Sequence, residues 1–278
     1  MIKPYFQENN FILFHGDALK ILEQFEINKF NLIYVDPPYF LSNDGITCSS
    51  GKMVSVNKGE WDKSRGFEED IKFIDTWLKN CKRVLKENGS IWISGTLHII
   101  YKIGYLLEKN NFDIINDIIW YKPNAPPNLS CKYFTHSHEI VLWARKSEKS
   151  KHTYNYEKMK LWNNPKDKLK NKDKQMRSVW SIPLIPKDEK EFGRHPTQKP
   201  LELLNRLISA SSKEGSWVLD PFMGSGTTGI VCSILNRKFI GIDINKDYLD
   251  LAIKRYKASK KRNLLYFSRK EAELTKFL

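Results

Sequence analysis

The sequence DPPY at residues 36–39 joins a carboxylate, two rigid prolines and an aromatic ring directly after the apolar run LIYV. Each proline lacks a backbone N–H and fixes φ, so the pair predicts that a β-strand ends here. The simplest interpretation is a stiff turn before a helix. The alternative is a pocket in which Asp36 and Tyr39 hold a flat, polar substrate.

A second candidate site is VLDPFMGSGTTG at residues 218–229, which places the pattern GxGxxG between an expected strand and an expected helix. Glycines in such a turn let a ligand approach backbone N–H groups at the helix N-terminus. Asp243 ends the next apolar run and could accept hydrogen bonds from ribose hydroxyls. The pattern by itself fits a nicotinamide dinucleotide as well as another nucleotide-like ligand.

Asp220, directly after the strand in this second motif, favours a cationic ligand. A carboxylate in this position would repel the pyrophosphate of a dinucleotide. S-adenosylmethionine carries an ammonium, a sulfonium and a ribose but no phosphate, so it suits the site better. A helix cap is the alternative role of Asp220.

The stretch HPTQKP at residues 195–200 gathers polar side chains just before a helix that starts at a proline. Lys199 would suit a ligand carboxylate, and Asp17 in HGDAL would suit an adenine amino group. Capping of a turn or helix explains these residues equally well. His136 and His138 form an HxH pair, but they have no third ligand and do not predict a metal site.

These motifs lie at the ends of short apolar runs, most of which are separated by helical patterns. The runs expected to form strands are residues 11–17, 32–36, 90–95, 112–120, 139–145, 217–220 and 239–243. The fourth and fifth runs lack an intervening helix and are expected to pair antiparallel. The alternation predicts an α/β fold whose mainly parallel sheet is covered by helices on both faces.

The formal net charge of +14 over 278 residues predicts a polyanionic partner, and nucleic acid is the first expectation. An AT-rich genome would also produce a Lys-rich composition. The four cysteines form no CxxC pair, which argues against a zinc site or a disulfide scaffold and favours the reducing cytoplasm. No signal core and no apolar run of about 18 residues occurs, so no membrane span is expected.

Residues 146–194 break the alternating pattern and are polar, basic and aromatic. The segment from Arg145 to Arg177 contains twelve Lys or Arg residues and four acidic residues, so its formal net charge is +8. This pattern predicts an insert that binds nucleic acid, with a solvated insertion as the alternative. A second stretch, residues 42–66, is rich in Gly and Ser and is expected to be a mobile lid or a long loop.

Together, DPPY, HPTQKP and DPFMGSGTT resemble the motifs of DNA amino-methyltransferases, which modify adenine N6 or cytosine N4. Catalytic motif, basic region and cofactor motif occur in the order of the beta class. The resemblance covers about residues 9–258. It is greatest to the second methyltransferases of DpnII-type restriction systems, which modify adenine in GATC, in the stretches DPPYFLSNDGI, VSVNKGEWDK, WISGTLH and NLSCKYFTHSHEIVLWARK.

The resemblance implies a Rossmann-like, seven-stranded mixed sheet of the S-adenosylmethionine-dependent methyltransferase type, circularly permuted with the catalytic half first. Residues 1–145 would form the catalytic half, 146–194 a target-recognition insert, and 195–260 the cofactor-binding half. The tail, residues 261–278, has no assigned role.

The resemblance also implies a mechanism. An exocyclic amine is a poor nucleophile because its lone pair is delocalised into the base, so the Asp36 carboxylate and the Pro37 carbonyl would accept its two hydrogens. The prolines hold these acceptors rigidly, and Tyr39 would stack on the flipped-out base. Methyl would pass directly from S-adenosylmethionine to nitrogen, without a metal. Asp36 in place of Ser favours adenine over cytosine.

The implied catalytic residues are Asp36, Pro37, Pro38 and Tyr39. The implied cofactor-binding residues are Asp17, Asp36, His195, Thr197, Gln198, Lys199, Asp220, Phe222, Gly224, Gly226, Thr227, Thr228 and Asp243. Trp61 and Asp62 are weaker candidates for the cofactor. Candidates for DNA contact, with an ordinary loop role as the alternative, are Lys122, Asn124, Tyr133 and Phe134.

The implied partners are double-stranded DNA, with single-stranded DNA as a further candidate, a cognate restriction endonuclease, and a second copy of the chain in a homodimer. The enzyme could equally act as an orphan methylase, and a cytoplasmic location is expected. The alternatives are methylation of cytosine N4 or RNA, a nicotinamide-dependent oxidoreductase, and a DNA-binding module without catalysis.

Overall fold

The computed structural model describes residues 2–42, 46–49, 52–55, 59–162, 174–193 and 195–261. The main sheet contains β1 (Phe6–Glu8), β2 (Phe11–His15), β3 (Phe30–Val35), β6 (Leu85–Gly95), β7 (Asp113–Tyr121), β8 (His138–Arg145), β9 (Val179–Ser181), β10 (Trp217–Asp220) and β11 (Lys238–Asp243), and a separate hairpin contains β4 (Ile46–Ser49) and β5 (Lys52–Ser55). The helices are α1 (Ala18–Glu23), α2 (Phe67–Val84), α3 (Ile100–Lys109), α4 (Tyr156–Leu161), α5 (Leu201–Ser211), α6 (Thr227–Ile234) and α7 (Lys246–Lys261), with 3-10 turns η1 (Glu60–Asp62) and η2 (Asp188–Lys190).

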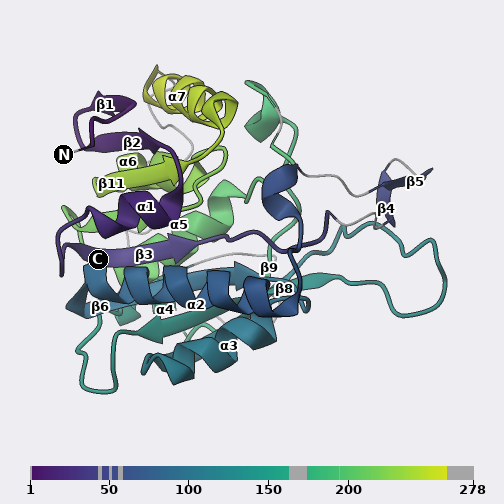
Figure 1. The fold of residues 1–278 in the computed structure, drawn as a ribbon, viewed down its shortest axis with the longest axis horizontal. Helices are drawn as coiled ribbons and strands as arrows, with labels where there is room; N and C mark the ends of the chain where they lie inside the picture. Colours follow the sequence, from purple (N-terminus) through teal and green to yellow (C-terminus); the bar gives the residue numbers. More distant parts are fainter. Residues whose placement is uncertain are drawn as a thin grey trace.

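The main sheet has the order β1-β2-β11-β10-β3-β6-β8-β7-β9 in the described part of the chain. Helices α1, α2 and α3 pack on one face, and α5, α6 and α7 pack on the other (Figure 1). Within β3, Ile33 and Val35 join the first layer whereas Leu32 and Tyr34 join the second. Strands buried on both faces read as unbroken apolar runs, which is why the sequence revealed them.

The seven predicted strands all form, as β2, β3, β6, β7, β8, β10 and β11. The strands β2, β11, β10, β3 and β6 are parallel, whereas β8 runs antiparallel to both β6 and β7. The predicted antiparallel pairing of the fourth and fifth runs is therefore confirmed. The sequence did not reveal β1 and β9, because a three-residue edge strand has no detectable apolar run.

The described parts of the predicted insert contribute to the core. Strand β9 adds to the edge of the sheet beside β7. Its residue Trp180 is buried and lies near Trp92, which stacks on Trp143 of β8 with ring centroids 4.6 Å apart. The predictions for residues 43–45, 50–51 and 56–58 of the lid, 163–173 of the insert and 262–278 of the tail lie outside the described residues.

The central strands bring three aspartates to one edge of the sheet. Strand β10 pairs in parallel with both β3 and β11, so the carboxyl ends of the three strands open together. Asp36 follows β3, and Asp220 and Asp243 end the other two. Parallel sheets of this kind bind ligands at that edge. No helix within the described ranges is long and apolar enough to cross a membrane.

Candidate active site

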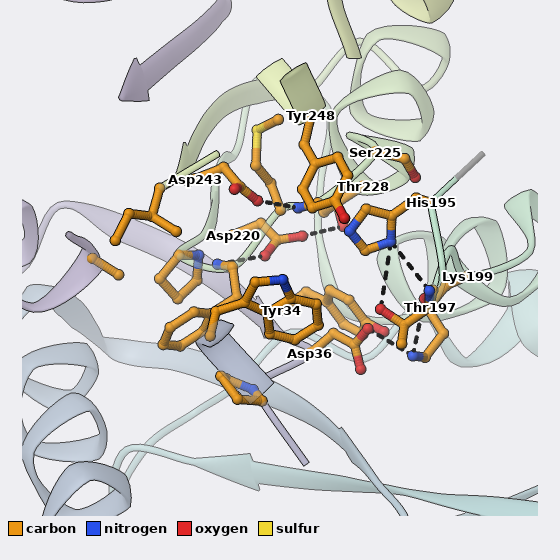
Figure 2. A pocket seen from close by; sticks show the side chains of 18 of the residues that line it. Tyr34, Asp36, His195, Thr197, Lys199, Asp220, Ser225, Thr228, Asp243 and Tyr248 are labelled. Atoms are coloured by element: carbon orange, nitrogen blue, oxygen red, sulfur yellow. Dashed lines mark hydrogen bonds and ion pairs between the residues drawn. The ribbon is translucent and has the colours of Figure 1, made fainter. Parts of the chain in front are cut away.

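A cavity of about 260 Å³ lies at this edge of the sheet. Figure 2 shows side chains from both ends of the chain's sequence converging on it. Every predicted cofactor-binding residue except Gly226 lines the cavity. Of the predicted catalytic residues, Asp36 and Pro38 line it, whereas Pro37 and Tyr39 do not.

Asp220 combines a place in the cavity wall with hydrogen bonds to the adjoining turn. It lines the cavity, and one carboxylate oxygen accepts a hydrogen bond from the Phe222 N–H at 3.1 Å while the other accepts one from the Thr228 hydroxyl at 2.5 Å. These bonds fix the turn that leads into α6. Burial raises the pKa of Asp220 to about 7. The folded protein thus holds this carboxylate where an adjacent cation would stabilise its ionised form.

Asp243 and Asp17 also combine a structural contact with a place in the cavity wall. Asp243 accepts hydrogen bonds from the backbone N–H groups of Gly224 at 2.9 Å and Asn245 at 2.8 Å. Burial raises its pKa to about 6. Asp17 caps α1 by accepting from the Leu19 N–H at 2.8 Å.

The glycines of GSGTTG are required by packing as well as by the turn. Gly226 begins α6 with a left-handed φ of 74°, and a Cβ atom there would lie 2.6 Å from the Cβ of Ala252 in α7. Gly224 has φ 49°, and a Cβ atom there would lie 2.8 Å from His195 Nε2. Gly226 therefore allows α6 to pack against α7, and it is not among the residues that line the cavity.

Three aromatic side chains form one wall of the cavity. The rings of His195 and Tyr248 lie 4.2 Å apart between centroids, and Trp61 stacks on His195 at 6.4 Å (His195 and Tyr248 are labelled in Figure 2). Sequence reasoning missed Tyr248, whose signal was only its position shortly after Asp243. Arg65 and Tyr34 also line the cavity without having been predicted.

Asp36, the carboxylate of DPPY, is held by two donors. One oxygen accepts a hydrogen bond from Lys199 Nζ at 2.6 Å, and the other accepts one from the Tyr39 hydroxyl at 2.7 Å. Burial raises the pKa of Asp36, although Lys199 opposes the rise. Burial also opposes the charge on Lys199, but Asp36 and Glu139 outweigh it and raise the pKa of Lys199. Lys199 and Asp36 thus form an ion pair in the cavity wall.

Glu139 is the functional candidate that sequence reasoning missed. Its carboxylate accepts a hydrogen bond from the Tyr39 hydroxyl at 3.2 Å and pairs with Lys122 at 2.9 Å. Lys122, predicted to contact DNA, therefore has a buried acid as its partner. The Tyr39 ring is only 5% exposed and lies beneath Lys199, whose Nζ is 5.3 Å from the ring centroid.

Asp62, a weaker candidate for the cofactor, holds the turn that follows DPPY and is not among the residues that line the cavity. Its carboxylate accepts backbone N–H groups from Tyr39 at 2.8 Å, Phe40 at 3.0 Å and Leu41 at 3.3 Å, and the Ser42 hydroxyl at 2.8 Å. Phe40 has φ 58°, which is strained for an aromatic residue. Such strain at a functional site persists only when neighbouring contacts hold it.

The remaining DNA candidates lie on the loop between β7 and β8. Asn124 accepts the Leu184 N–H at 2.8 Å and so ties the loop to the chain after β9. Tyr133 and Phe134 are 61% and 95% exposed. The loop leaves the sheet beside the carboxyl end of β6, so it projects from the same edge as the cavity (Figure 1). No cluster of three or more metal-binding side chains occurs within the described ranges.

Comparison with known proteins shows which family this chain resembles in sequence. Residues 30–254 match the family N6_N4_Mtase, described as DNA methylase. The type II methyltransferase M2.DpnII of Streptococcus pneumoniae is 52% identical over 264 residues, covering 95% of this chain and 96% of that protein. The type II methyltransferase M2.LlaDCHI of Lactococcus lactis subsp. cremoris is 52% identical over 256 residues, covering 92% of both.

The crystal structure of the M1.HpyAVI–SAM complex has the same fold, with a TM-score of 0.62 and 29% identity over 87% of this chain and 97% of that one. These matches confirm the predicted Rossmann-like methyltransferase fold and the resemblance based on the three motifs. The chain belongs to the N6/N4 DNA methylase family and is a DNA methyltransferase.

Proposed function

We propose that the protein transfers a methyl group from S-adenosylmethionine to the N6 amino group of a flipped-out adenine in GATC. The observation that carries the proposal is that the aspartate of DPPY and the aspartates of the proposed cofactor site meet at one edge of the sheet. Asp36, which is followed by two prolines, lines the cavity together with Asp220 and Asp243. The choice of adenine and of GATC rests on DPPY and on the resemblance to second methyltransferases of DpnII-type systems.

The charges of the cavity favour S-adenosylmethionine over a nucleotide with phosphates. Four aspartates line the cavity, whereas the lysine and arginine side chains that line it are Lys199 and Arg65. An excess of carboxylates repels phosphate and attracts an ammonium or sulfonium group. When bound, S-adenosylmethionine supplies an electrophilic methyl group. The acids that would hold it are Asp17, Asp220 and Asp243, with the aromatic wall beside them.

The catalytic turn activates the target nitrogen. In the proposed mechanism, the carboxylate of Asp36 and the carbonyl of Pro37 accept the two amino hydrogens, which draws the nitrogen toward a tetrahedral geometry. Asp62 and the prolines keep these acceptors fixed, so little reorganisation is needed when the base arrives. After transfer, Asp36 is placed to accept the proton that the nitrogen loses. The same turn would present Tyr39 to the base once Lys199 moves.

Several further assignments belong to this proposal. Residues 1–145 and 195–260 would form the catalytic and cofactor halves, and residues 146–194 would read the DNA sequence, with Tyr133 and Phe134 at its rim. Double-stranded DNA is the proposed substrate, and single-stranded DNA is a second form to test. A cognate restriction endonuclease, a homodimer and a cytoplasmic location are proposed from the resemblance to type II relatives.

A defined oligonucleotide experiment tests the proposal. A duplex with one GATC site is incubated with labelled S-adenosylmethionine, and the modified base is identified by mass spectrometry. We expect N6-methyladenine in that site and none in a duplex with the site scrambled. Detection of N4-methylcytosine alone would assign the chain to cytosine. Calorimetry should show binding of S-adenosylmethionine, and binding of NAD in its place would contradict the proposed cofactor.

A further inference from the structure

Glu139 is a largely buried carboxylate that reaches the DPPY turn from β8. Its side chain is 12% exposed, and both of its oxygens have partners. One accepts a hydrogen bond from Lys122 Nζ at 2.9 Å. The other accepts one from the Tyr39 hydroxyl at 3.2 Å and lies 3.8 Å from Lys199 Nζ. A buried acid is costly unless it is paired in this way, so the cluster acts as one unit.

The two donors that occupy Asp36 both have Glu139 as a second acceptor. Lys199 Nζ lies 2.6 Å from Asp36 and 3.8 Å from Glu139, and the Tyr39 hydroxyl lies 2.7 Å and 3.2 Å from the same two acids. Each oxygen of Asp36 already accepts from one donor. An incoming amino group competes with these two donors for Asp36, and Glu139 is the second carboxylate toward which a released donor can turn, although Lys199 also lies 3.4 Å from the Thr197 carbonyl oxygen.

We propose that Glu139 is a positioning residue for methyl transfer, which accepts Lys199 or Tyr39 when the target amino group takes that donor's place on Asp36. This rests on the proposed function, because it assumes that Asp36 receives the amino group. Lys122 balances the charge of Glu139 through its other oxygen. The two carboxylates and two ammonium groups therefore remain neutral as a set during the exchange.

The charges around Asp36 predict how its titration depends on Glu139. Burial raises the pKa of Asp36, Lys199 opposes the rise, and Glu139 adds to it. Burial also opposes ionisation of Glu139, but Lys199 and Lys122 outweigh it and lower the pKa of Glu139. Removing the charge at position 139 should therefore lower the pKa of Asp36. The other titratable groups that face the pair are Tyr34, Tyr39 and Asp220.

The test compares substitutions in the full-length chain by measuring kcat and KM across a range of pH. Glu139→Gln keeps the size but removes the charge, and we expect kcat to fall about 10- to 100-fold with little change in KM. The acid limb of its kcat profile should move to lower pH. Glu139→Asp keeps the charge, so its acid limb should stay in place while its shorter reach still lowers kcat.

Asp113→Asn is the matched control, because it removes a carboxylate paired with Arg145 at the other end of the same two strands. We expect it to leave kcat and the pH profile unchanged. Normal kcat in Glu139→Gln would overturn the proposal, and so would a reduced kcat with an unmoved acid limb, which indicates a purely structural role.

Circular dichroism and cofactor binding establish whether each variant folds. If Glu139→Gln does not fold, Glu139→Asp decides, because normal kcat in that variant would contradict the need for a closely placed acceptor. Failure of the proposed function would look different. The unaltered chain would then transfer no methyl group to adenine, whatever the behaviour of the variants.

Discussion

The two proposed halves of the candidate active site, catalytic and cofactor-binding, hold their carboxylates in different ways. In the cofactor half, Asp220 accepts hydrogen bonds from residues two and eight positions further along the chain. In the catalytic half, Asp36 accepts from Tyr39, three positions away, but also from Lys199, which is 163 positions away. The first half is a local structure that a strand, a turn and a helix build by themselves. The second half exists only when distant elements meet, so we expect its function to be more sensitive to single changes.

The largest expected effect is at Asp36, in the catalytic half. Asp36→Ala should lower methyl transfer by at least about 10³-fold, because it removes the acceptor for the amino group and leaves Lys199 without its nearest counter-ion. Binding of S-adenosylmethionine should persist, since the cofactor half keeps its own contacts. Radiolabelled transfer and calorimetry measure the two quantities. Substantial turnover by Asp36→Ala would contradict the proposed mechanism.

A matched pair of acids separates the two halves further. Asp62 accepts backbone N–H groups of the catalytic turn, whereas Asp243 accepts those of the cofactor turn. Asp62→Ala should lower kcat about 10- to 100-fold with a nearly unchanged Kd for S-adenosylmethionine, whereas Asp243→Ala should chiefly raise that Kd by a similar factor. Steady-state kinetics and calorimetry would show the split. Equal effects of both changes on Kd would show that the halves are not separable.

The pH dependence of cofactor binding tests the cofactor half alone. Burial raises the pKa of Asp220 to about 7, so below that pH the folded protein binds a proton there, and above it burying the carboxylate weakens the fold. A bound cation offsets that cost. Affinity for S-adenosylmethionine, and the thermal stabilisation it provides, should therefore be greater at pH 8 than at pH 6. Asp220→Asn should flatten both trends, and a trend of opposite sign would exclude Asp220 as the group responsible.

The smallest expected effects concern the glycines that shape the cofactor turn. Gly226→Ala should lower the free energy of unfolding by about 2–4 kcal/mol, because a left-handed φ and the contact with Ala252 act together. Gly215 is the control, since its φ of 73° matches but a Cβ atom there would meet nothing within 4 Å. Gly215→Ala should cost only about 1 kcal/mol. Urea denaturation gives both values, and equal costs would rule out the packing contribution.

Local sequence patterns were enough to predict the seven strands between β1 and β9 and most of the cavity wall. Strands buried on both faces are apolar throughout, and the turns that follow them are rich in Gly, Pro and Asp. Both features can therefore be recognised in a short stretch of sequence. Asp220, Asp243 and Asp17 could be found for this reason. Edge strands β1 and β9 could not, because three residues at the rim of a sheet need no distinctive pattern.

The side chains that meet at Asp36 depend on how distant parts of the chain pack together. Nothing in the spacing of Glu139, Lys122 and Lys199 indicates that they form one cluster with Asp36. They come from different parts of the chain, and the strand order of the folded sheet brings them together. Likewise, Asp62 can accept backbone N–H groups of the turn after DPPY only because η1 packs against that turn. Local sequence can specify a strand end and its turn, whereas long-range electrostatic partners follow from topology.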